Sequence, residues 1–244
     1  MFWMSAFLDV PAPDFERSVS FWSAVTGYSP SARRGADGEF LTLVPPAGDD
    51  HLRMQRVGDA SPRIHLDLHV TDARAAADRA VALGGVQVVD QGYVVVRSPG
   101  GLSFCFVSHP AAQPAPPASW AGGSVSIVDQ VCLDIPGAIF DGEAAFWQEL
   151  LQWPLKASPY AEFERLVRPD GQPLHVLLQR VGDEGPVRAH LDLACSTRGL
   201  ELERHLGLGA TLVAEHEQWT VLDDPAGMAY CLTDRAPQPD LGRK

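Results

Sequence analysis

His65-Leu66-Asp67-Leu68 and His190-Leu191-Asp192-Leu193 carry the same four residues, 125 positions apart in a chain of 244. In both segments, polar residues alternate with leucines, as in a strand that buries one of its faces. Just upstream of each, Gln55-Arg56-Val57-Gly58-Asp59 recurs as Gln179-Arg180-Val181-Gly182-Asp183. A period this long indicates a duplicated domain, because the units of solenoid proteins are roughly 20 to 50 residues long.

The repeat begins near the start of each copy. Asp9-Val10-Pro11 returns as Asp134-Ile135-Pro136, and Phe21-Trp22 returns as Phe146-Trp147, again 125 residues later. Every polar residue that is kept in both copies can therefore be compared with its twin.

Each copy contains the same order of elements twice. A short apolar segment at 6–10 predicts a strand, and Phe15, Val19, Trp22 and Val25 follow at helical spacing, with Asp14 as the expected N-cap. Three β-like segments come next, around residues 28–33, 39–44 and 51–57. Residues 64–107 repeat this βαβββ order. We therefore predict an α+β protein of two tandem domains, each made of two βαβββ modules.

A segment rich in proline and glycine separates the copies. It contains Pro110, Pro114, Pro116, Pro117, Gly122 and Gly123, which interrupt any regular period. The predicted boundaries are a first domain at 1–109, a linker at 110–124, a second domain at 125–235 and a tail at 236–244. Proteolysis in the linker is expected to release two folded halves if the interface between them is modest.

The composition restricts the partners of the chain. With 19 basic and 31 acidic residues, its formal charge of −12 disfavours nucleic acid and anionic membranes. The chain lacks a long apolar segment, and its first residues do not resemble a signal peptide, so we expect a cytoplasmic monomer or homodimer. The four cysteines lie in strand-like segments without CxxC spacing, which favours buried, reduced thiols.

In the first copy, His65 to Asp72 open the second module, and Ser98-Pro99-Gly100-Gly101 come before its last strand. This order of modules and motifs resembles the vicinal oxygen chelate superfamily. This superfamily contains glyoxalase I, extradiol dioxygenases, fosfomycin-modifying enzymes and bleomycin-resistance proteins. The resemblance implies a cupped mixed sheet in each domain, with helices on its convex side and the ligand inside the cup. The superfamily contains catalysts and non-catalytic binders, so it leaves open whether this chain is an enzyme.

Strand alternation predicts which side chains face the cup. Leu66 and Leu68 suit the helix side, which leaves His65, Asp67 and His69 for the cup. Alternation would place His51, four residues before Gln55, on the cup side, but at the start of the strand a structural or solvated histidine is expected. The predicted ligand-binding residues, with Tyr93 and Trp219 as stacking candidates after turns, are Phe7, Asp9, Arg53, Gln55, Asp67, His69, Tyr93, Cys105, Gln130, Asp134, Gln179, Asp192, Trp219 and Cys231.

The resemblance also implies four metal-ligand positions per domain. They correspond to Ser5, Gln55, His65 and Cys105 in the first copy, and to Gln130, Gln179, His190 and Cys231 in the second. Neither quartet contains a carboxylate, so both are poor sites for a hard divalent ion. We therefore predict no obligatory cofactor, with zinc or nickel in the second domain as the alternative.

Three functions are compatible with these residues. The first is the binding of a small organic molecule in one or both cups, without an obligatory metal. The second is a lyase or isomerase, with or without an ion, in which His65 or His190 is the general base towards a proton next to a carbonyl. The third is a regulatory module whose ligand controls a partner.

Overall fold

The computed structural model describes residues 1–58, 61–182 and 184–237, so the predicted tail lies outside the described residues from position 238 onward. The first copy contains β1 (Trp3–Pro11), α1 (Phe15–Thr26), β2 (Ser29–Pro30), β3 (Phe40–Val44), β4 (Leu52–Val57), β5 (Arg63–His69), α2 (Ala73–Ala82), β6 (Val86–Asp90), β7 (Val94–Arg97) and β8 (Ser103–Val107). These elements form two βαβββ modules, as predicted.

The second copy repeats this order. It contains β10 (Val125–Pro136), α3 (Phe140–Leu151), β11 (Leu155–Ala157), β12 (Phe163–Leu166), β13 (His175–Val181), β14 (Arg188–Cys195), α4 (Arg198–Gly207), β15 (Thr211–Glu215), β16 (Trp219–Asp223) and β17 (Ala229–Thr233). In the linker segment, β9 (Ala118–Ser119) pairs with β10. Among the described residues, no helix is long and apolar enough to cross a membrane.

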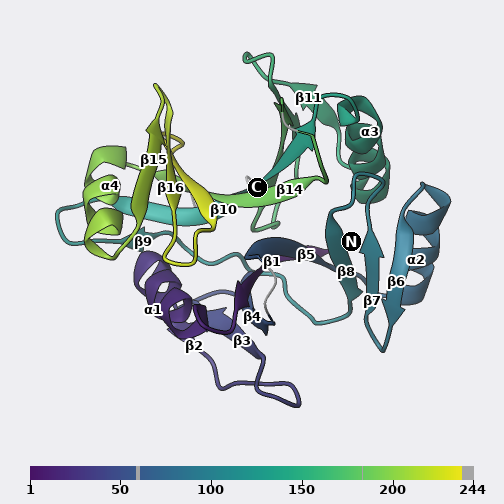
Figure 1. Cartoon of the computed structure of the whole chain (residues 1–244), viewed down its shortest axis with the longest axis horizontal. Helices are drawn as coiled ribbons and strands as arrows, with labels where there is room; N and C mark the ends of the chain where they lie inside the picture. The colour runs from purple at the N-terminus through teal and green to yellow at the C-terminus, as the bar shows by residue number, and fades with distance from the viewer. Residues whose placement is uncertain (59–60, 183, 238–244) are drawn as a thin grey trace.

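Each copy forms one mixed sheet with the same strand order. The order is β2-β3-β4-β1-β5-β8-β7-β6 in the first copy and β11-β12-β13-β10-β14-β17-β16-β15 in the second. The first strands of the two modules, β1 and β5, are antiparallel neighbours at the centre, and each runs parallel to the last strand of its own module. The predicted α+β fold of two tandem domains is confirmed (Figure 1).

The helices form where the apolar spacing predicted them. Phe15, Val19, Trp22 and Val25 lie on the buried face of α1, which ends at Gly27 with a left-handed φ of 73°. One detail differs, because the Asp14 carboxylate does not cap the helix and instead binds the Arg17 guanidinium at 2.6 Å.

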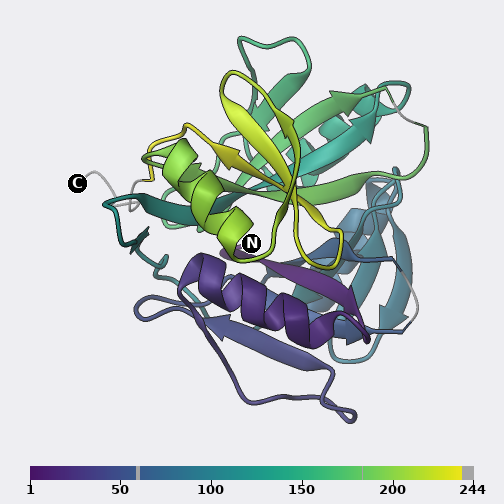
Figure 2. The same ribbon diagram turned by 60° about the vertical axis from the view of Figure 1, so that its left-hand side comes forward.

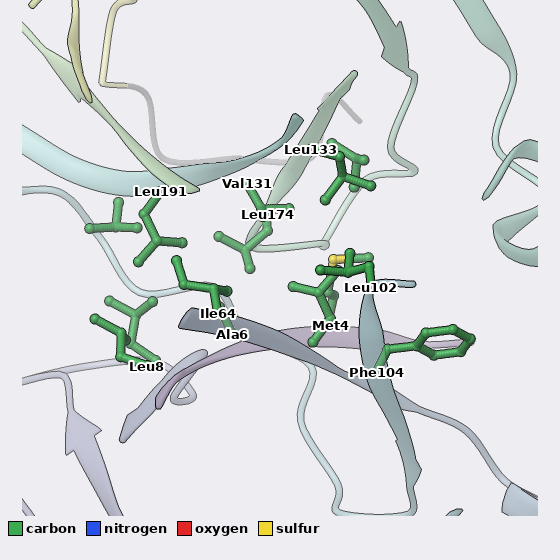
Figure 3. Packing of buried hydrophobic residues seen from close by; sticks show 14 of the residues in the cluster. Met4, Ala6, Leu8, Ile64, Leu102, Phe104, Val131, Leu133, Leu174 and Leu191 are labelled. Carbon is green, nitrogen blue, oxygen red and sulfur yellow. The ribbon is translucent and has the colours of Figure 1, made fainter. Parts of the chain in front are cut away.

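The two sheets pack against each other through their convex faces. Figure 3 shows Met4, Ala6 and Leu8 of the first sheet facing Val131, Leu133 and Leu191 of the second. These side chains belong to one buried apolar cluster that includes residues of both copies. The apolar side of each central strand was expected to pack on its own helix, whereas much of it packs on the other sheet.

The helices complete this shared core by pairing between the copies. Helix α1 lies beside α4, where the Arg204 guanidinium donates to the Ala24 and Val25 carbonyls at 3.0 Å each (Figure 2). At the opposite end, Arg79 of α2 donates to the Glu149 carbonyl of α3. The interface between the copies is thus part of the core. Proteolysis in the linker was expected to release two folded halves only if this interface were modest, and that condition is not met.

Candidate functional site

A cavity of about 360 Å³ lies on the face of the first sheet that is turned away from the shared core. Strand alternation explains its lining, because Leu66 and Leu68 pack inward and leave His65 and Asp67 on the outer face. The lining residues are Phe7, Asp9, Arg34, Phe40, Arg53, Gln55, Arg63, His65, Asp67, Tyr93, Val95, Ser103, Cys105, Val107 and His109.

A chain of charged groups crosses the floor of this first cup. The imidazole Nδ1 of His65 lies 2.9 Å from the Asp9 carboxylate, and its Nε2 lies 3.8 Å from Asp67. The Arg53 guanidinium is 3.6 Å from the other oxygen of Asp67. The His65 ring also stacks on Phe7, with centroids 4.7 Å apart. The floor therefore combines fixed charges with an aromatic surface.

The second sheet carries a larger cavity, of about 900 Å³, on its corresponding face. Its lining includes Gln130, Cys132, Lys156, Tyr160, Phe163, Arg165, Arg168, His175, Leu177, Gln179, His190, Asp192, Trp219, Cys231, Asp234 and Arg235. At its centre, His190 Nδ1 donates to Asp134 at 3.1 Å, while Nε2 lies 3.4 Å from Asp192. The Gln130 amide donates to Asp192. The arrangement of one histidine between two aspartates is therefore common to both cups.

These contacts determine the charge of each histidine. Burial alone would lower the pKa of His65, but Asp9 and Asp67 raise it above its usual value. Burial likewise opposes the charge of His190, yet Cys132, Asp134 and Asp192 raise its pKa well above 6.5. Burial raises the pKa of Cys132 to about 12. The two flanking aspartates thus favour the imidazolium form of His190.

Most of the predicted ligand-binding residues line the two cups, with two exceptions. His69 is fully buried at the end of β5, where its Nδ1 donates to the His109 carbonyl at 2.8 Å and its Nε2 accepts from Ser5 at 2.9 Å. Asp134 is absent from the cavity lining and acts on the cup through its hydrogen bond to His190. Alternation located the correct face, but it could not show which residues the neighbouring segments cover.

His51 does not face the cup and instead has a structural role. Its Nε2 donates to the Val128 carbonyl of the second sheet at 2.9 Å, and the side chain is buried between the copies. Strand β4 begins only at Leu52, so the alternation that places Arg53 and Gln55 on the cup does not extend to His51.

Sequence reasoning missed several residues that line the cups. They are Arg34, Phe40 and Arg63 in the first cup and Lys156, Tyr160, Phe163 and Arg165 in the second. In β12, Phe163 and Arg165 lie on one face of the strand and the buried Leu166 lies on the other. The strand is only four residues long, so this alternation was a weak signal in the sequence.

The structure changes the predicted set of metal ligands. Ser5 lies opposite Asp67 in the β1–β5 register, and Phe7 lies opposite His65, so the first quartet is not one row of side chains. In the second copy, Gln179 accepts from the Cys132 thiol at 3.7 Å. The donors that converge are His65, Asp67 and Cys105 in the first copy, and His190, Asp192 and Cys231 in the second, each set within 4.8 Å.

This second set fits a zinc-like ion better than the predicted quartet does. Imidazole nitrogen, carboxylate oxygen and thiolate sulfur are the ligands that zinc takes in proteins. The buried Oδ1 atom of Asp192 lies 3.4 Å from His190 Nε2 but accepts no hydrogen bond in the described part of the chain. The bond from His190 Nδ1 to Asp134 resembles the carboxylate contacts that orient metal-bound histidines. The predicted quartets contain no carboxylate, whereas the donors that converge in the structure include Asp67 in the first copy and Asp192 in the second.

Comparison with known proteins identifies the family and the fold of both copies. The family model for the glyoxalase-like domain matches residues 5–107 and 130–233. No curated protein matches the chain at a significant level. Many solved structures share its fold, among them three of low sequence identity to this chain.

The Mn(II)-bound glyoxalase from Novosphingobium aromaticivorans is 17% identical, with a TM-score of 0.65 over 94% of this chain and 80% of that chain. An extradiol ring-cleaving dioxygenase from B. fuscum is 13% identical, with a TM-score of 0.66 over 98% and 72%. A 4-hydroxymandelate synthase variant from Streptomyces coelicolor is 16% identical, with a TM-score of 0.60 over 96% and 93%. Because the family model matches both repeats, the chain belongs to the glyoxalase-like domain family, and it shares its fold with these three structures.

Proposed function

We propose that this protein binds a small organic molecule in the cup of one or both domains, and that binding does not require a metal. The observation that carries the proposal is the pair of cavities, of about 360 and 900 Å³, on equivalent faces of the two sheets. Volumes in this range, lined by aromatic walls with a few convergent polar groups, are typical of small-molecule sites.

The aromatic walls favour a ligand with a flat apolar part. In the second cup, the Phe163 and Trp219 rings meet edge to face, with centroids 5.8 Å apart. They come from strands on opposite sides of the sheet, so they bridge its two arms. A ring placed against this wall would gain the contacts that aromatic pairs prefer.

The test fills each cavity without removing its charged groups. Val95→Trp adds bulk to the first cup and Leu177→Trp to the second. Val86→Trp and Val213→Trp add the same side chain at exposed sites of the same domains. Saturation-transfer NMR against a panel of aromatic compounds should detect binding that the filling variants abolish and the controls retain. Binding that survives in the doubly filled protein would overturn the proposal.

A second candidate function is proton transfer by a lyase or isomerase. It is favoured by the aspartate that contacts Nδ1 of the histidine in both copies, as in residues that hold a general base in place. However, a base must be neutral, and the two flanking aspartates favour the imidazolium form of His190. Binding is therefore better supported. Exchange of the α-protons of 2-tetralone in D₂O, lost in His65→Gln/His190→Gln, would instead support the enzyme.

The donor sets bear on the enzyme alternative. His190, Asp192 and Cys231 would hold a divalent ion in the second cup, and His65, Asp67 and Cys105 in the first. Such an ion supplies Lewis acidity to a ligand oxygen. Around it, Asp134 would orient the His190 ring, and Gln130 would keep Asp192 in position.

A further inference from the structure

The two cups differ at one edge of the sheet. Lys156 of β11 and Arg165 of β12 are register partners on adjacent antiparallel strands, and both line the second cavity. Like charges directly opposite each other destabilise a pair of strands unless an anion compensates them. Glu164, the acidic neighbour of Arg165, lies opposite Leu178, whose side chain is buried in the shared core.

The other charged groups of the second cup already have partners. Asp192 lies beside His190, Asp234 lies 3.3 Å from Arg198, and Arg235 binds Asp129 at 2.6 Å. Within residues 1–58, 61–182 and 184–237, neither Lys156 nor Arg165 has a carboxylate partner at ion-pair distance. The carboxylates of the cup are thus neutralised, while two cations are left for a ligand.

The surroundings of this pair are positive, although the whole chain carries a charge of −12. Burial, together with Arg168, Arg235 and Arg165, lowers the pKa of His175 in the same cup to about 3. A locally positive cavity in an acidic protein concentrates anions at that position.

The first copy lacks the pair. Its equivalent hairpin carries Ser31 and Thr42, as the pairing of β2 with β3 and of β3 with β4 shows. Both hydroxyls contact the Arg34 guanidinium, at 3.1 and 2.9 Å. The duplication therefore supplies a natural comparison, in which one cup has two cations paired across the strands at this edge and the other has two hydroxyls that contact a single cation, Arg34.

An aromatic wall adjoins the basic edge. The Tyr160, Phe163 and Trp219 rings form a chain of edge-to-face contacts, with successive centroids 6.4 and 5.8 Å apart. Arg165, Leu177, Cys132 and His190 occupy one row across four adjacent strands. With strands about 4.8 Å apart, the row spans about 14 Å between the backbones of Arg165 and His190. This length suits an aromatic ring with an attached acid.

We infer that the second cup selects an aromatic carboxylate, whose carboxylate binds Lys156 and Arg165 while its ring packs against Tyr160, Phe163 and Trp219. The inference rests on the proposed binding function and names its ligand class. Bidentate contact from the Arg165 guanidinium and a point charge from Lys156 are the usual means of holding a carboxylate.

The experiment compares 2-naphthoate with its neutral isostere, 2-naphthamide, by calorimetric titration. The protein carries Val95→Trp, so that only the second cup is open. Lys156→Ser/Arg165→Thr introduces the residues of the first copy, and Arg180→Gln removes one positive charge from the other face of the same domain, where Arg180 pairs with Asp141.

We expect naphthoate to bind more tightly than the amide, and Lys156→Ser/Arg165→Thr to weaken naphthoate roughly tenfold or more without affecting the amide. Arg180→Gln should change neither. Equal binding of both probes, or naphthoate binding that is unaffected by the double substitution, would overturn the anion site and leave the binding function intact. If neither probe binds, both proposals fail for this cup.

Discussion

Alternate residues of β5 pack in the core and line the cavity. Leu66 is fully buried against the shared core, while His65 and Asp67 face the cavity. This division could be predicted from His65-Leu66-Asp67-Leu68 alone, because side chains alternate strictly along a strand. The partners of the cavity-facing groups could not be predicted, since the contact of Asp67 with Arg53 depends on strand register and long side chains.

The leucines on the inner face should control stability. Replacing Leu66 or Leu191 by Ala should lower the free energy of unfolding by about 2 to 5 kcal/mol, because each leaves a cavity in the core. Urea denaturation measures the change. Leu212→Ala, at an exposed site of β15, serves as the control and should alter stability little. Equal costs at the three sites would show that the assigned inner face is wrong.

His51 should make stability depend on pH. Burial lowers its pKa to about 4, because protonation would place a second N–H in a site where Nδ1 has no partner among the described residues. The folded pKa is below the unfolded value of 6.5, so protonation favours unfolding. The stabilisation is complete above pH 6.5 and is lost as the pH falls from there through about 4, a difference of roughly 3 kcal/mol.

The control for this prediction is His51→Gln, whose amide can donate to the Val128 carbonyl but does not titrate. Its free energy of unfolding should fall less steeply than that of the wild type between pH 6.5 and 4. Parallel curves for the two proteins would exclude His51 as the cause.

Removing metal should leave ligand binding intact. The aromatic wall and the basic edge of the second cup do not include His190, Asp192 or Cys231, so their contacts with a ligand do not depend on an ion. Titration of 2-naphthoate before and after treatment with a chelator, with elemental analysis of the starting protein, tests this expectation. An ion present in stoichiometric amount, and binding that disappears with it, would favour the metal-dependent alternative.

At the scale of elements, the helices were predictable as helices but not in their packing. The spacing of Phe15, Val19, Trp22 and Val25 showed that α1 buries one face, but an apolar face does not specify what covers it. The structure shows Trp22 donating to the Asp224 carboxylate of the other copy at 2.8 Å. The equivalent Trp147 instead donates to Glu143 of its own helix, which also accepts from Gly100 of the first copy.

Arg204 should contribute more to the interface than its twin Arg79. Arg204 contacts the fully buried Glu201 at 2.6 Å and stacks on Trp120, as well as donating to the end of α1. Arg204→Ala should therefore cost about 3 to 5 kcal/mol, as loss of one partner of a buried pair does. Arg79→Ala, which removes an exposed contact to the Glu149 carbonyl, is the matched control. Similar melting temperatures for the two variants would contradict this ranking.

At the scale of the molecule, the duplication and the module order could be predicted, because the same residues recur at a constant spacing in the sequence. The contact between the two sheets could not, since Leu8 and Leu191 have the same burial whether a helix or a sheet covers them. The proline-rich segment predicted a boundary in the sequence, but it contained no information on how much surface the copies share.

The shared core predicts how a cut in the linker behaves. A protease site inserted at Gly122-Gly123, an exposed turn between β9 and β10, should yield two fragments that still elute together and unfold in one transition. Separation would expose Ala6, Leu8 and Ile64 of the first sheet to water, which is unfavourable in proportion to the apolar area. Size-exclusion chromatography of the cut protein provides the measurement. Two separate, folded fragments would show that each copy is self-sufficient.

The pairing of α1 with α4 and of α3 with α2 relates the copies by an approximate two-fold axis, which is the symmetry of a homodimer. A molecule with one copy would need a second molecule to cover its convex face, so its folding would follow mass action and fail on dilution. In the tandem chain the partner is always attached, and the linker fixes its effective concentration. The contact between the two copies is therefore independent of the abundance of the protein, and each cup is free to diverge because its partner no longer carries the same sequence.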